Sequence, residues 1–87
     1  MDVLIHPSAE KTMNKLSFEI KQKIKTIIKK LSEDPYSKQI DVKKLKGLGN
    51  KPDLFRLRCG EYRIIYAIKE DKIWITDIFK REKGYHF

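Results

Sequence analysis

The sequence predicts an α+β domain: an N-terminal strand and a helical hairpin precede a three-stranded antiparallel meander, and the helices pack on one face of a single sheet. Apolar residues recur at helical spacing between positions 9 and 31 and alternate with polar residues between 54 and 80, where two short turn sequences intervene. The 87 residues suffice for one domain, so we assign residues 1–87 to a single domain.

The first half of the chain predicts a short strand at residues 2–6 and two helices. Pro7 and Ser8 are typical of a helix start, since proline fits the first turn and serine can cap it. Ser17 is a second capping candidate, for a longer helix whose lysines and apolar residues alternate at helical spacing. We interpret this helix as an amphipathic core helix and not as a membrane helix. Its apolar positions are Phe18, Ile20, Ile24, Ile27, Ile28 and Leu31.

Helical periodicity stops at residues 32–53, which we expect to form a long connection that is either functional or loosely ordered. Within its lysine-rich part, the only acidic residue is Asp41. We expect Leu45 and Leu48 to tie the connection to the core.

The meander is predicted from three alternating segments at 54–59, 62–69 and 72–80. A two-residue loop at positions 60–61 would place Arg58 opposite Arg63 and Arg56 opposite Ile65. The helix-facing side would then carry Phe55, Leu57, Cys59, Tyr62, Ile64, Tyr66, Ile68, Ile73, Ile75 and Phe79. The open face would carry Arg56, Arg58, Arg63, Ile65, Ala67, Trp74, Thr76, Ile78 and Lys80.

Strict alternation puts Asp77 on the helix-facing side, which is unusual for a carboxylate. Either Asp77 lies at the margin of the sheet, or a bulge near the end of the last strand changes its register. A bulge would also bring Arg81 toward the other arginines.

All four arginines lie between positions 56 and 81, whereas the 16 lysines are spread along nearly the whole chain. Like charges directly across two strands cost up to ~1 kcal/mol, so Arg58 opposite Arg63 favours a site that binds an anion. The alternative is that the arginines pair with Asp53, Glu61 or Asp77. The net charge of +8 also favours a polyanionic partner, although a lysine-rich surface in a heat-adapted protein would look similar.

Other kinds of site are not indicated. Cys59 is the only cysteine, and we expect it to be a small buried hydrophobe, not a nucleophile. His6 and His86 have no partners at ligand spacing, so we expect neither a metal nor a cofactor. The N-terminal apolar run is too short for a signal peptide or membrane span, and we expect a cytoplasmic protein without a membrane partner.

Three segments carry a resemblance to a known family: KKLKGL at 43–48, LFRLRCGEYRIIY at 54–66 and IFKREKGY at 78–85. They resemble the RelE toxins of the RelE/ParE superfamily, and the match extends over nearly the entire chain. The segment GEYRIIY is the most specific part. The ending KREKGY favours RelE, since ParE relatives share the fold and much of the Tyr-Arg strand.

The resemblance implies a toxin that cuts messenger RNA in the ribosomal A site without a metal, by attack of the ribose 2′-OH on the adjacent phosphate. It implies a RelB-type antitoxin as partner, and operator DNA only through the antitoxin complex. Two alternatives remain open: a ParE-like inhibitor of DNA gyrase, and a catalytically inert module for antitoxin binding and co-repression.

The resemblance also assigns roles to residues. Arg63 would hold the scissile phosphate, Arg81 would help the 5′-oxygen leave, and Tyr85 would stack on a base. Arg56 and Arg58 match basic strand residues, one of which acts on the 2′-OH, but arginine is a poor proton acceptor, so the base stays open. We expect contacts with RNA or the ribosome from Lys43, Lys44, Lys46, Lys80 and Lys83.

Overall fold

The computed structural model describes residues 1–45 and 53–81. Its elements, in chain order, are β1 (Asp2–Ile5), α1 (Pro7–Asn14), α2 (Phe18–Glu33), β2 (Asp41–Lys44), β3 (Leu54–Cys59), β4 (Tyr62–Lys69) and β5 (Lys72–Lys80). The strands form one five-stranded sheet in the order β1-β5-β4-β3-β2, in which β1 runs parallel to β5 and the other pairs are antiparallel. The predicted α+β fold class is confirmed.

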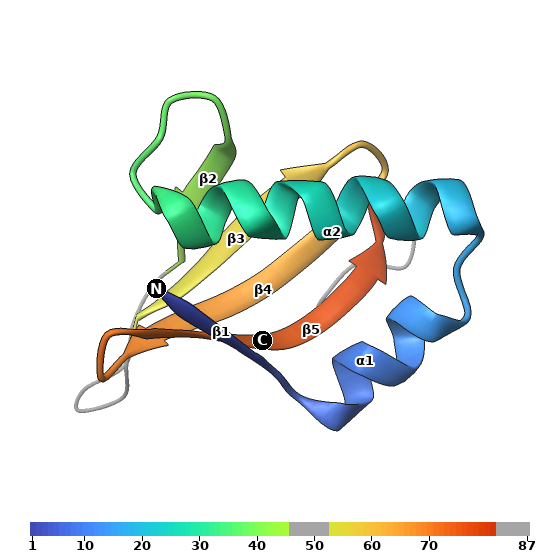
Figure 1. Ribbon diagram of the computed structural model, residues 1–87, viewed down its shortest axis with the longest axis horizontal. Helices are drawn as coiled ribbons and strands as arrows, with labels where there is room; N and C mark the ends of the chain where they lie inside the picture. Colours follow the sequence, from blue (N-terminus) through green and yellow to red (C-terminus); the bar gives the residue numbers. More distant parts are fainter. Residues whose placement is uncertain (46–52, 82–87) are drawn as a thin grey trace.

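Both helices contribute to a single core on one face of the sheet, where α2 crosses the strands and α1 lies near β5 (Figure 1). Within the sheet, the rings of the paired residues Phe55 and Tyr66 stack with centroids 5.3 Å apart. The buried core consists of Ala9, Met13, Ile24, Ile28, Leu31, Ile40, Leu57, Ile64, Tyr66, Ile73, Ile75 and Ile78. No helix in the described part of the chain is long and apolar enough to span a membrane.

The helix starts follow the sequence closely. Ser17 caps α2 as predicted, with its side chain accepting a hydrogen bond of 3.4 Å from the Ile20 N–H. The cap of α1 is His6, not Ser8, because the His6 Nδ1 accepts a hydrogen bond of 3.1 Å from the Ser8 N–H. Ser8 therefore lies inside the first turn.

Strand β2 corrects the prediction that residues 32–53 form one long connection without regular secondary structure. Asp41–Lys44 pairs with β3, so the sheet gains a fifth strand at its edge. Its four residues include an acid and two lysines, and charged residues are common in edge strands. The segment is too short and too polar to show the alternation of a strand in the sequence. Leu45 ties this segment to the sheet through its N–H, which donates to the Leu54 carbonyl at 2.7 Å, whereas Leu48 lies outside the described residues.

The predicted register of the β3–β4 hairpin is confirmed: Arg58 lies opposite Arg63, and Arg56 lies opposite Ile65. Between β4 and β5 the register shifts by one residue. Tyr66 pairs with Ile75 but the preceding Ile65 pairs with Asp77, which leaves Thr76 as the extra residue of a bulge.

The bulge reverses the predicted facing of the end of β5. Ile78, predicted on the open face, pairs with Ile64 and is buried in the core. Phe79, predicted on the helix side, lies opposite Arg63, and Lys80 lies opposite Tyr62. Asp77 consequently shares the open face with Ile65, so that a carboxylate does not enter the core.

We expect Ile64→Ala to lower the free energy of unfolding by about 2–5 kcal/mol, because Ile64 is fully buried and its truncation leaves a cavity. Denaturant titration monitored by circular dichroism measures this change. Phe18→Ala is the control, since Phe18 is 75% exposed and its loss should change stability by less than about 0.5 kcal/mol. Equal effects of the two substitutions would contradict the assigned core.

Burial, together with the neighbouring Tyr36, raises the pKa of Tyr66 from 10.0 to about 12. Because the folded pKa lies above the unfolded one, the resulting stabilisation is fully present below pH 10 and is lost as the pH rises toward 12. We expect a late phase in the tyrosinate absorbance titration that Tyr66→Phe removes. A late phase that persists in Tyr66→Phe would contradict this prediction.

Candidate functional site

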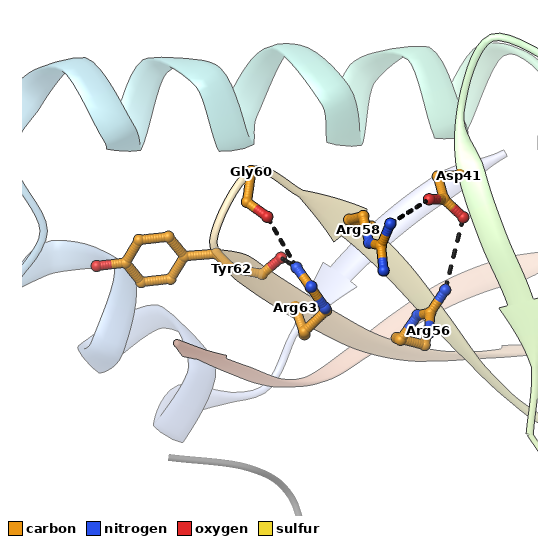
Figure 2. A network of polar contacts seen from close by, with 6 residues as sticks. All are labelled: Asp41, Arg56, Arg58, Gly60, Tyr62 and Arg63. Carbon is orange, nitrogen blue, oxygen red and sulfur yellow. Dashed lines mark hydrogen bonds and ion pairs between the residues drawn. The ribbon is translucent and has the colours of Figure 1, made fainter. Parts of the chain in front are cut away.

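The four arginines converge on the open face of the sheet, and we call this group the arginine site (Arg56, Arg58, Arg63 and Arg81). Strand register places the first three: Arg56 and Arg58 lie two residues apart on β3, and Arg63 is the direct partner of Arg58 on β4 (Figure 2). Arg81 lies near enough for its charge to lower the pKa of Arg63, and its backbone N–H donates to the Glu61 carbonyl at 2.6 Å, at the tip of the β3–β4 hairpin.

Arg63 is the fixed member of the arginine site. Arg63 is only 7% exposed, and among the described residues it is the one charged residue that is buried. The Nη1 group donates to the Gly60 carbonyl at 2.8 Å and to the Tyr62 carbonyl at 2.9 Å (Figure 2). Two backbone acceptors therefore hold the guanidinium in one orientation, which is the preorganisation that anion binding requires.

Electrostatic repulsion acts within the arginine site. The pKa of Arg63 is lowered, first by burial and then by the positive charges of Arg58, Arg56 and Arg81. An arginine stays protonated at neutral pH even so. The part of the shift that comes from the other three arginines reflects positive charge that a bound anion would offset.

Among the residues that the structure describes, the carboxylate of Asp41 forms ion pairs with the arginine site. The Asp41 Oδ1 lies 3.5 Å from Arg56 Nη2, and its Oδ2 lies 3.4 Å from Arg58 Nη1 (Figure 2). The alternative of pairing with Asp53, Glu61 or Asp77 therefore missed the acid involved. Asp53 pairs with Lys44 at 3.1 Å, and Glu61 pairs with Lys80 at 3.8 Å.

The sequence offered one indication that Asp41 could pair with the arginines, because Asp41 is the only acid in its basic segment. That indication could not be used without β2, because the register of β2 places Asp41 opposite Arg58. Asp41 does not occupy all the hydrogen-bond donors of the arginine site. Arg56 Nε is buried and has no hydrogen-bond partner among the described residues.

The predicted RNA-contacting lysines are divided between the two faces of the sheet. Lys43 lies opposite Arg56 and shares the face of the arginine site, whereas Lys44 lies opposite Phe55 on the helix side. Lys80 lies on the helix side as well, opposite Tyr62. Lys46, Lys83 and Tyr85 fall outside the described residues.

The chemistry available here is that of cations and hydrogen-bond donors. Among residues 1–45 and 53–81, no group of three or more histidine, cysteine, aspartate or glutamate side chains is placed to hold a metal. Cys59 is half-buried, and burial raises the pKa of its thiol although Lys23 opposes the shift. A raised thiol pKa disfavours the thiolate form that a nucleophile needs.

The family is established by the sequence. A family model described as the ParE toxin of the type II toxin–antitoxin system parDE matches residues 3–85. The chain therefore belongs to this family within the RelE/ParE superfamily, and it is a toxin of a toxin–antitoxin system. No curated protein sequence matches the chain significantly.

Solved structures confirm the RelE-like fold. The archaeal RelE–RelB complex from Pyrococcus horikoshii OT3 contains a chain with 29% identity and a TM-score of 0.80, and the match covers 95% of this chain and 97% of that one. The RelB–RelE complex from Methanococcus jannaschii gives 26% identity and a TM-score of 0.73, with 92% of each chain covered. The isolated Escherichia coli RelE toxin gives 20% identity and a TM-score of 0.70, covering 95% of this chain and 86% of that chain.

The arginine site should bind multivalent oxyanions in the isolated protein. At a pyrophosphate concentration ten times the Kd, we expect a stabilisation of about 1.4 kcal/mol. For a domain of this size, that corresponds to a Tm increase of about 5–10 °C relative to chloride at equal ionic strength. Differential scanning fluorimetry measures the increase.

Arg63→Gln should remove most of this stabilisation, because the residue is the fixed donor of the site. Lys11→Gln is the matched control, since it removes the same charge from an exposed position on α1. An equal Tm increase in wild type and Arg63→Gln would locate the anion elsewhere on the surface.

Proposed function

We propose that this toxin is a ribosome-dependent endoribonuclease that cleaves messenger RNA in the A site and thereby inhibits translation. The observation that carries the proposal is the convergence of four arginines around Arg63, whose guanidinium is fixed by two backbone carbonyls. Such a group is suited to a phosphate whose negative charge grows during the reaction.

In the proposed reaction, the ribose 2′-oxygen attacks the adjacent phosphorus and the bond to the 5′-oxygen breaks. The products are a 2′,3′-cyclic phosphate and a 5′-hydroxyl end. The phosphorane between these states carries extra negative charge on its non-bridging oxygens. Preorganised cations stabilise this species more than the ground state, which lowers the barrier without a metal ion.

Each arginine has a place in this scheme. Arg63 would hold the non-bridging oxygens, because it is the buried and oriented member of the group. Arg81, directly after β5, would assist departure of the 5′-oxygen. Arg56 and Arg58 would stabilise negative charge at the 2′-oxygen as cations, since a guanidinium rarely accepts a proton. Tyr85 would stack on a base and order the cut nucleotide.

The proposed partners follow from charge and from the similar complexes. Lys43, beside Arg56 on the open face, extends the positive surface available to RNA, and we assign Lys44, Lys46, Lys80 and Lys83 to contacts with RNA or the ribosome. Two of the similar structures are complexes of RelE with RelB. A RelB-type antitoxin with an acidic segment would complement the net charge of +8, and it would link the toxin to operator DNA.

A second candidate is inhibition of DNA gyrase, which the ParE description of the matching family favours. Such a toxin would change DNA topology and leave messenger RNA intact. A third reading, a catalytically inert module that binds antitoxin and acts as co-repressor, would keep antitoxin binding when the arginines are removed.

Toeprinting of a translating ribosome complex tests the proposal. Wild-type protein should create new messenger ends in the A site. Arg63→Ala should lower the cleavage rate by about 10²–10³-fold, because it removes a donor that acts on the transition state. Arg81→Ala and Tyr85→Ala should each weaken cleavage, whereas Lys11→Ala, on α1, should cleave as wild type does.

All variants must first show the wild-type circular dichroism spectrum, so that lost activity reports chemistry and not unfolding. Intact messenger with folded wild-type protein would overturn the nuclease proposal. A gyrase supercoiling assay would then test the second candidate.

A further inference from the structure

Asp41 holds an unusual position among the charged residues of the sheet. It is the first residue of β2, it lies directly opposite Arg58, and each of its carboxylate oxygens faces a different arginine (Figure 2). The antiparallel pairing with β3 fixes its backbone. One carboxylate thus spans the two guanidinium groups of a single strand face.

The two ion pairs of Asp41 are too long and too exposed to contribute much to the stability of the fold. Their separations of 3.5 and 3.4 Å exceed those of strong charge-assisted hydrogen bonds, which are about 2.7–2.9 Å. The side chain of Asp41 is also 52% exposed, and half-exposed ion pairs contribute little to stability. What the two ion pairs supply is an electrostatic attraction of both guanidinium groups toward the same carboxylate.

The arginine site needs such an effect. Arg58 and Arg56 both lower the pKa of Arg63 through their charge, so the three cations repel one another across β3 and β4. Arg63 is held by backbone carbonyls, but Arg56 and Arg58 have Asp41 as their charged partner in the described ion pairs. Without that carboxylate, repulsion would drive the two flexible side chains away from Arg63 and into solvent.

We propose that Asp41 is a positioning residue of the cleavage site, which holds Arg56 and Arg58 beside Arg63 without itself contacting the scissile phosphate. The proposal rests on the nuclease function proposed above. It predicts two opposite effects of the Asp41 carboxylate. The carboxylate weakens RNA binding, because it cancels one positive charge. It raises the cleavage rate of the bound complex, because it keeps the cations where negative charge develops.

Steady-state cleavage of ribosome-bound messenger tests both effects with Asp41→Asn, which keeps the size of the side chain and removes its charge. The kcat should fall about ten- to a hundredfold, in keeping with the cost of misplaced catalytic groups, while KM falls as well. Loss of folded protein would lower the apparent kcat without lowering KM. Asp41→Glu should recover most of the rate, because it restores a carboxylate at the same register position.

Asp53→Asn is the matched control. It removes the same charge from a half-exposed acid that is ion-paired with Lys44 and not with an arginine. Its kcat should equal that of wild type, whereas its KM should fall, because the substitution leaves the charge of Lys44 uncompensated. An unchanged kcat in Asp41→Asn, or an equal decrease of kcat in both variants, would overturn the positioning role.

The pH profile separates positioning from proton transfer. If Asp41 acts through the arginines, Asp41→Asn lowers kcat by the same factor across the neutral range. Loss of the acidic limb of the profile in this variant alone would show that Asp41 accepts the proton itself, and it would overturn the proposal.

A readout without the ribosome distinguishes failure of this inference from failure of the nuclease proposal. In ¹⁵N spectra of the arginine Nε–Hε groups, Asp41→Asn should increase the mobility of Arg56 and Arg58 and leave Arg63 unchanged, whereas Asp53→Asn should change none of them. If these changes in mobility are seen but the wild-type protein does not cleave messenger RNA, only the nuclease proposal is refuted. Unchanged mobility of Arg56 and Arg58 in Asp41→Asn would refute the inference whatever the activity.

Discussion

The contact between Arg58 and Arg63 across β3 and β4 is the interaction on which the site depends, and it is unfavourable in itself. What maintains it is the other face of the same strands. Leu57 and Ile64, which are paired with each other and fully buried, lie next to these arginines in sequence. A slip of one residue would expose both apolar side chains and bury guanidinium groups, so burial of the core holds the cations together.

The bulge at Thr76 makes a second connection between core and site. By adding one residue to β5, it places Ile78 in the core and turns Asp77 toward the open face. It also sets the facing of everything that follows, up to Arg81 and its hydrogen bond to the hairpin loop. A local irregularity in one strand therefore brings the fourth arginine to the other three.

Holding the arginines in this arrangement costs free energy, which the folding of the rest of the domain offsets. The guanidinium of Arg63 is withdrawn from water and repelled by its neighbours, and both effects lower its pKa. Backbone carbonyls and the carboxylate of Asp41 offset part of that cost. What remains is uncompensated positive charge that a bound oxyanion would neutralise, in keeping with the proposed action on a phosphate backbone.

The sequence by itself determined the helices, the meander and the register of the β3–β4 hairpin. Each depends on local rules: the 3.6-residue period of α2, the cap at Ser17, and a two-residue loop that leaves only one pairing of Arg58 with Arg63. Three arginines of the candidate site could be placed on one face for this reason. The family resemblance also rested on contiguous segments.

Only the tertiary structure decided the placement of β2, the bulge and the partner of the arginines. Asp41–Lys44 is too short and too polar to signal a strand, and it becomes one by pairing with β3, more than ten residues later. The bulge places Ile78, and not Phe79, in the core opposite Ile64, a choice that depends on the pairing of β5 with β4. Asp41 meets Arg56 and Arg58 through that same long-range pairing, and no rule of local sequence encodes a contact whose register is set by a distant strand.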